Sequence, residues 1–96
     1  SSKMFVDEKG NKFMRLAIHP GGAFGIHGHS GSMDILYIID GEGIAICNGV
    51  EEKLEPGNCH VCPDGSKHEF KNTGTKDLQI VAFVPKIARS LVKIYL

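Results

Sequence analysis

Residues 21–41 read GGAFGIHGHSGSMDILYIIDG. This stretch places His27 and His29 two residues apart, and Asp34 follows five residues later. Side chains of a β-strand repeat with a period of two, so both histidines are predicted to project from the same face. A turn through residues 30–32 would bring Asp34 back beside them. Two imidazoles and a carboxylate that converge from strands of one sheet make a site for a divalent transition metal.

A second segment supplies one more histidine. Residues 57–72 read GNCHVCPDGSKHEFKN. Pro63 fixes φ and Gly65 supplies a positive φ, so the sequence predicts a turn here. One strand would end before this turn at Cys62, and the next would start after it at His68. The sequence therefore predicts that a second hairpin brings His68 to the same site.

Short strands and tight turns are expected along the whole chain, which has 12 glycines among 96 residues. Strands are predicted at residues 3–8, 12–19, 24–29, 33–40, 44–48, 50–54, 59–62, 67–71 and 78–84. Residues 86–96 fit both a helical stripe and a strand, and are expected to pack on the barrel as a strand or a single helical turn. Nine or ten short strands at this spacing favour one all-β domain, a sandwich or barrel, over residues 1–96.

Strand parity gives a check on the predicted metal site. If Asp34 and His68 face inward, the following residues of their strands and of the last strand do so too: Leu36, Ile38, Phe70, Asn72, Leu78, Ile80, Ala82 and Val84. The charged residues beside His68 then face water, as expected for a half-buried strand. The outward residues of the strand at 33–40 are apolar instead: Ile35, Tyr37 and Ile39. Such a row predicts that a second sheet or a partner subunit covers it.

Bulk properties exclude several classes of partner. The chain has eleven acidic and eleven basic residues and no basic run, which disfavours nucleic acid and anionic membrane surfaces. No apolar stretch is long enough to span a bilayer, and no signal peptide is expected before the fold. An odd count of three cysteines favours thiols in a reducing compartment, with the cytoplasm as the default. A domain of this size is near the lower limit for a self-sufficient core, so a homodimer is expected.

The two segments together resemble the paired signatures of the cupin superfamily. The first signature, glycine, His-x-His, glutamate and glycine at fixed spacing, is matched by Gly21, His27, His29, Asp34 and Gly41. The second is matched by Gly57, Pro63, Gly65, His68 and Asn72. Fifteen residues separate the motifs, as in small single-domain microbial cupins. The resemblance covers residues 12–84 and implies a double-stranded β-helix, a jelly-roll-like barrel.

The resemblance implies one divalent metal ion per chain, held by His27, His29, Asp34 and His68. Such ligands suit Fe, Mn, Ni, Zn or Cu, and do not choose among these metals. Asp34 stands where the family usually has a glutamate, which is one methylene longer. It would either reach the metal directly or act through a water. A third reading makes Asp34 a proton-transfer group beside a three-histidine site, and so a candidate catalytic residue.

The implied function is a metal-dependent enzyme, of the oxygenase, isomerase or lyase type, that acts on a small molecule in the barrel pocket. The apolar wall of that pocket is predicted to consist of Phe24, Met33, Leu36, Ile38 and Phe70. The alternative is a non-catalytic cupin that binds a small molecule or sugar, for example as a sensor, with a structural metal or none. The fold alone does not decide between them, because cupins host many chemistries.

The remaining histidines and cysteines have less specific readings. His19 and His60 are expected to be structural or exposed. Cys59-x-x-Cys62 has the spacing of a zinc or redox motif, but residues three apart in a strand point to opposite faces. The cysteines, with Cys47, are therefore expected to be small core or rim residues, one of which could line the pocket.

Overall fold

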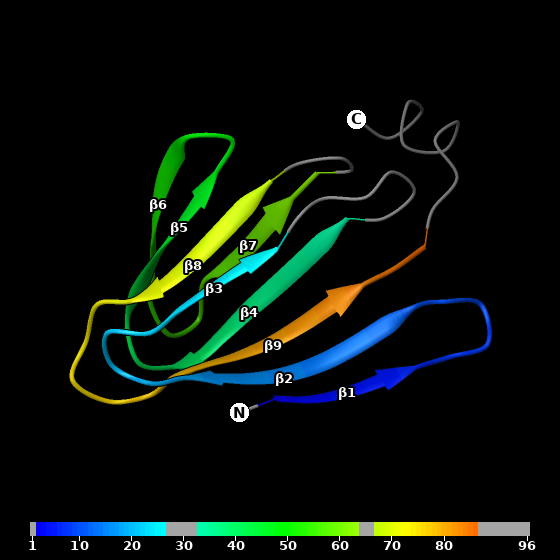
Figure 1. Ribbon diagram of the computed structural model, residues 1–96, viewed down its shortest axis with the longest axis horizontal. Helices are drawn as coiled ribbons and strands as arrows, with labels where there is room; N and C mark the ends of the chain where they lie inside the picture. The colour runs from blue at the N-terminus through cyan, green and yellow to red at the C-terminus, as the bar shows by residue number, and fades with distance from the viewer. Residues whose placement is uncertain (1, 27–32, 64–66, 87–96) are drawn as a thin grey trace.

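Two antiparallel β-sheets form the fold of the computed structural model, which describes residues 2–26, 33–63 and 67–86 (Figure 1). Its strands are β1 (Ser2–Val6), β2 (Lys12–Ile18), β3 (Ala23–Ile26), β4 (Asp34–Asp40), β5 (Gly43–Cys47), β6 (Val50–Leu54), β7 (Cys59–Cys62), β8 (His68–Asn72) and β9 (Leu78–Val84). The five-stranded sheet has the order β1-β2-β9-β4-β7, and the four-stranded sheet has the order β3-β8-β5-β6. This all-β arrangement confirms the predicted double-stranded β-helix. None of the described residues forms a helix that is long and apolar enough to cross a membrane.

The strand boundaries follow the turn residues closely. The predicted strands at 50–54, 59–62 and 78–84 coincide with β6, β7 and β9. The strand predicted at 24–29 begins one residue earlier, at Ala23, and its last three residues lie outside the described part of the chain. Residues 87–96 of the predicted C-terminal segment also lie outside it. The other predicted strands differ from the observed ones by one or two residues at one or both ends.

The core lies between the two sheets and follows the predicted parity. Along β4, buried residues alternate with more exposed ones, and Leu36 and Ile38 have no exposed surface. Their cross-strand partners on β9 are Ala82 and Ile80, which are also fully buried. The core comprises Leu16, Ile18, Leu36, Ile38, Ala45, Leu54, Phe70, Leu78, Ile80 and Ala82. Val84, also expected to face inward, is half-buried at the end of β9.

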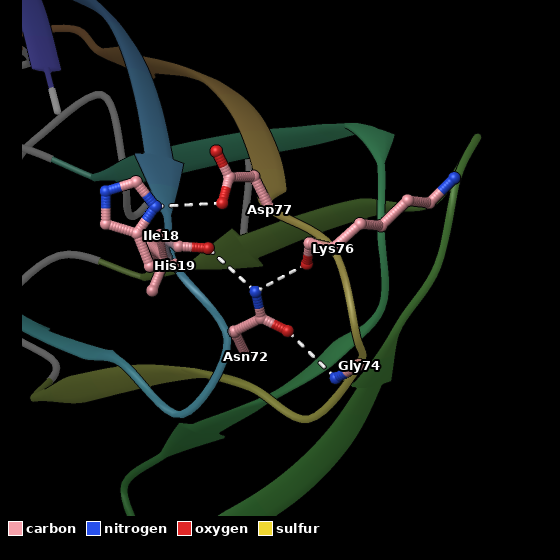
Figure 2. A network of polar contacts seen from close by, with 6 residues as sticks. All are labelled: Ile18, His19, Asn72, Gly74, Lys76 and Asp77. Atoms are coloured by element: carbon pink, nitrogen blue, oxygen red, sulfur yellow. Dashed lines mark hydrogen bonds and ion pairs between the residues drawn. The ribbon is translucent and has the colours of Figure 1, made fainter.

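Asn72, the last residue of the second motif, fixes the end of β8 to two other segments (Figure 2). Its side-chain amide donates to the backbone oxygens of Ile18, at 2.7 Å, and of Lys76, at 2.8 Å. Its Oδ1 accepts a hydrogen bond of 2.8 Å from the amide of Gly74. The buried amide therefore satisfies backbone groups that the strands leave without partners.

The outer face of the five-stranded sheet carries a continuous apolar row. Cross-strand pairing joins five residues, one on each strand, in the order Phe5, Phe13, Phe83, Ile35 and Val61. Four of these side chains are exposed: Phe5, Phe13, Phe83 and Val61. Tyr37 and Ile39 are exposed beside this row, as the parity of β4 predicted. We call the five paired residues the apolar row below.

Candidate functional site

Two of the four predicted metal ligands meet where the strands begin. Asp34 is the first residue of β4 in one sheet, and His68 is the first residue of β8 in the other. Asp34 Oδ2 lies 2.6 Å from His68 Nε2, and both side chains are buried. The contact therefore crosses the interior at one end of the barrel. The other two predicted ligands, His27 and His29, lie outside the described residues.

Two cysteines complete a ring of four side chains at this end of the barrel. Cys62 is the cross-strand partner of Asp34, and Cys47 is the cross-strand partner of His68. The two sulfur atoms lie 2.7 Å apart, so they too bridge the two sheets. Cys62 is a fully buried residue and Cys47 a half-buried one, within the expectation of small core or rim residues.

His60 lies one layer deeper and is buried, with 3% of its surface exposed. Its Nδ1 lies 2.8 Å from Glu52 Oε2, a contact that joins edge strands β7 and β6 of the two sheets. Its ring meets the edge of Phe70, with centroids 5.9 Å apart. Of the two readings expected for His60, structural or exposed, burial excludes the second. His19, by contrast, is exposed just after β2 and pairs with Asp77 at 2.8 Å, as Figure 2 shows.

Two histidine ring nitrogens near the Asp34–His68 contact are candidate metal-ligating atoms. His60 Nε2 and His68 Nδ1 are both buried and have no hydrogen-bond partner within the described ranges. One ligating atom from each of His60, Cys62 and His68 lies within 4.8 Å of the other two. Each histidine also has its other nitrogen against a carboxylate, the arrangement that fixes the tautomer of a metal-ligating histidine. Imidazole, thiolate and carboxylate groups in this arrangement fit a divalent transition metal.

Sequence reasoning missed His60 and Cys62 as members of this cluster. The period of β7 places them on one face and Cys59 on the other, and Cys59 is indeed exposed. Cys59 and Cys62 therefore lie on opposite faces of β7, as the strand period predicted. The missing information was the pairing of β7 with β4, which sets Cys62 opposite Asp34.

The residues predicted as a pocket wall lie in different surroundings. Leu36, Ile38 and Phe70 are fully buried core side chains, and Met33 is half-buried just before β4. Phe24 borders a cavity of about 340 Å³ at the open side of the barrel. A cavity of about 510 Å³ lies at the site end and is lined by Gly25, Ile46, Asn48, Gly49, Lys67, His68 and Glu69. Gly25, Glu69 and Ile46 are cross-strand neighbours on the outward parity of β8, so this cavity opens on the outer face of the four-stranded sheet, behind the buried side chain of His68.

Comparison with known proteins identifies the family. The family model for the cupin domain matches residues 14–84. The oxalate-binding protein of Thermotoga maritima is 34% identical over 83 residues, which are 86% of this chain and 69% of that protein.

Solved structures agree with this relationship. A predicted oxalate decarboxylase from Thermotoga maritima superposes with a TM-score of 0.75 at 27% identity, covering 90% of this chain and 79% of that one. The Cnp3 cupin domain of Schizosaccharomyces pombe has a TM-score of 0.82 at 12% identity, covering 99% and 72%, and shows the fold alone. With the family model covering most of its length, this chain belongs to the cupin family.

Proposed function

We propose that this chain is a metal-binding cupin that holds one divalent transition metal ion beside His68 and binds a small carboxylate at the same end of the barrel. The contact of 2.6 Å between Asp34 Oδ2 and His68 Nε2 carries the proposal. Two ligand atoms that each lie about 2.1 Å from one ion stand roughly 3 Å apart. A small separation of these two atoms would therefore let both bind the same ion.

The ligand set that we favour is the one the first motif predicts, with His27, His29 and Asp34 around His68. The cluster of His60, Cys62 and His68 supports a second set, because its ligating atoms lie within 4.8 Å of one another. His68 belongs to both sets, so it is the residue on which metal binding should depend most. The identity of the metal, among Fe, Mn, Ni, Zn and Cu, is left to elemental analysis.

When bound, the ion would supply a Lewis acid with open positions for oxygen ligands. The residues of the chain have their own tasks around it. Glu52 would hold the Nδ1 proton of His60, which leaves Nε2 as a lone-pair donor. In the second ligand set, where Asp34 is not a ligand, its carboxylate can accept the proton on His68 Nε2.

A small carboxylate is the ligand class that the surroundings of His68 favour. The cavity on the outer face of the four-stranded sheet, behind His68, is lined by Lys67 and Asn48, a cation and an amide that suit a carboxylate, although Glu69 opposes them. The backbone of Lys67 is held by Asn48, whose backbone N–H donates to Lys67 O at 2.9 Å and whose side-chain Oδ1 accepts from Lys67 N at 3.1 Å. The Thermotoga relative is named for oxalate binding, so oxalate is the first member of the class to test.

The second candidate function is catalysis on the bound carboxylate, with Asp34 as the proton-transfer group. The Asp34–His68 pair favours it, because decarboxylation replaces the departing carbon dioxide with a proton. A structural relative is described as a predicted oxalate decarboxylase, at 27% identity. Release of carbon dioxide and formate from oxalate by the metal-loaded protein would make the chain an enzyme.

We also propose that two copies associate through the apolar row, because it exposes three phenylalanines on one sheet face. The proposed location is the cytoplasm, where the reducing poise keeps cysteines as thiols.

Metal content and oxalate binding test the proposal together. We expect near-stoichiometric metal in the untagged protein and a loss of most of it in His68→Ala. Loss in His27→Ala and His29→Ala, but not in His60→Ala and Cys62→Ser, would support the favoured ligand set, and the reverse would support the second. Retention of full metal by His68→Ala would contradict both.

Calorimetric titration of the metal-loaded protein with oxalate then addresses the ligand. We expect Lys67→Ala to keep its metal and to bind oxalate roughly tenfold more weakly, about the value of one charge-assisted contact. The matched control is Lys71→Ala, on the same sheet face but further from the site, which should bind as the wild type does. Metal loading without any oxalate heat would remove the carboxylate part of the proposal.

A further inference from the structure

Cys47 and Cys62 meet at the site end of the barrel but have no part in the favoured ligand set. Their sulfur atoms lie 2.7 Å apart, and both are thiols. A disulfide bond is about 2.05 Å long, so its formation requires the two atoms to move together by less than an ångström. We propose that Cys47 and Cys62 form a redox-active pair, which a hydroperoxide converts into a disulfide between the two sheets.

The two cysteines differ in access, which assigns their roles. Cys47 is half-buried at the end of β5, whereas Cys62 has no exposed surface. Cys47 Sγ would therefore attack the peroxide, taking one oxygen as a sulfenic acid and releasing the alcohol, or water when the oxidant is hydrogen peroxide. Cys62 Sγ then attacks the sulfur of Cys47, a water leaves and the disulfide forms. In total, two thiols are oxidised to one disulfide and one hydroperoxide is reduced; with hydrogen peroxide the products are two waters.

The position of the pair gives the disulfide a consequence for the fold. Cys47 lies on β5 of the four-stranded sheet, and Cys62 lies on β7 at the edge of the five-stranded sheet. Their cross-strand partners are His68 and Asp34, respectively. The disulfide would join the two sheets in the same layer as the Asp34–His68 contact. Oxidation therefore locks the end of the barrel at which small molecules are proposed to bind.

The turn beside Cys47 holds its strand in place. Asn48 and Gly49 both have positive φ, at 50° and 83°, as in the tight turn of a two-residue hairpin. Cys59, in contrast, lies on the outward face of β7 and is exposed. It provides a matched control, because it is the more accessible thiol and has no place in the pair.

Mass spectrometry of the full chain after treatment with hydrogen peroxide tests the proposal. We expect the protein to become lighter by the two thiol hydrogens, and peptide mapping to locate the bond at Cys47–Cys62. The bond should form equally in Cys59→Ser, and not in Cys47→Ser or Cys62→Ser. A dithiol reductant should restore the starting mass.

Thermal unfolding gives a second readout. The disulfide joins residues 15 positions apart, so oxidised Cys59→Ser should unfold at a temperature higher by about 12–24 °C than its reduced form. Cys47→Ser should show no such shift. Overoxidation of Cys47 without a disulfide, or a bond that involves Cys59, would overturn the proposal.

Discussion

Asn72 serves the fold, whereas His68, in the same family motif, is a proposed metal ligand. We expect Asn72→Ala to lower the free energy of unfolding by about 1–3 kcal/mol, because it leaves buried backbone groups unsatisfied. These are the carbonyl oxygens of Ile18 and Lys76 and the amide of Gly74. Urea denaturation measures the change. The control is Asn58→Ala, which loses an exposed bond of 3.4 Å and should stay within about 0.5 kcal/mol of the wild type.

The second motif therefore mixes two kinds of residue. His68 and Asn72 lie at opposite ends of β8, and both face inward. The spacing of the motif identified them equally well, because an inward parity is common to both. Only the contacts separate them: His68 meets a carboxylate across the barrel, whereas Asn72 bonds to backbone.

Part of the candidate site could be predicted from the spacing of residues within the two motifs. Asp34 and His68 were identified from spacing, and the structure places them in contact. Cys47 and Cys62 carry no such signal, because their meeting depends on two cross-strand registers and on the packing of two sheets. Spacing along one chain does not encode these relations.

At the scale of the strand, the turns determined how much was predictable. Glycine, proline and asparagine mark the ends of β6, β7 and β9, whose limits were predicted without error. Strand order was not predictable in the same way. β9 lies between β2 and β4 although it is the last strand that the structure describes, and β7 pairs with β4 across an intervening hairpin.

Gly41 joins β4 to β5, where both the backbone conformation and the space around the residue favour glycine. Its φ is +86°, and an added Cβ would lie 2.5 Å from Asp77 O. Gly49 has a similar φ of +83°, but nothing lies within 4 Å of its Cβ position. We expect Gly49→Ala to cost about 1–2 kcal/mol of unfolding free energy, from backbone conformation alone, and Gly41→Ala to cost clearly more. Equal losses in chemical denaturation would show that the contact with Asp77 relaxes freely.

The turn between β1 and β2 makes a prediction about pH. The Asp7 carboxylate accepts bonds from the Asn11 side chain and from the amides of Lys9 and Asn11, each at 2.9 Å. The bond from the Asn11 side chain, above all, lowers the pKa of Asp7 below its ordinary 3.8. A lowered pKa in the folded state means that the stabilisation is complete above the unfolded value and is lost as pH falls through the folded one.

The melting temperature of the wild type should therefore exceed that of Asp7→Ala at about pH 5, and the difference should shrink on acidification through the folded pKa. Glu8→Ala removes the neighbouring carboxylate and is the control for general charge effects. A difference between wild type and Asp7→Ala that stays constant over this range would exclude the hydrogen-bonded carboxylate as its cause.

At the scale of the whole molecule, the small size of the domain and the apolar residues on its surface both favour association of two copies. A domain of 96 residues buries a modest fraction of its surface, so association adds to a limited core. The apolar row crosses all five strands of one sheet, while Glu69 and Lys71 form an ion pair on the outer side of the other. The two outer faces thus differ in kind, and the apolar face is the one suited to a second copy.

Sedimentation velocity tests the proposed dimer. Phe83 lies at the middle of the apolar row, between Phe13 and Ile35, and Phe83→Lys would place a charge at the centre of the interface. We expect the wild type to sediment as a dimer and Phe83→Lys as a folded monomer. The free-energy cost of burying an unpaired ammonium group exceeds the stabilisation that the apolar contacts of the interface provide. Lys71→Glu, on the outer face of the other sheet, is the control and should remain dimeric. A wild type that is monomeric at high micromolar concentration, or a Phe83→Lys variant that remains dimeric, would contradict association through this face.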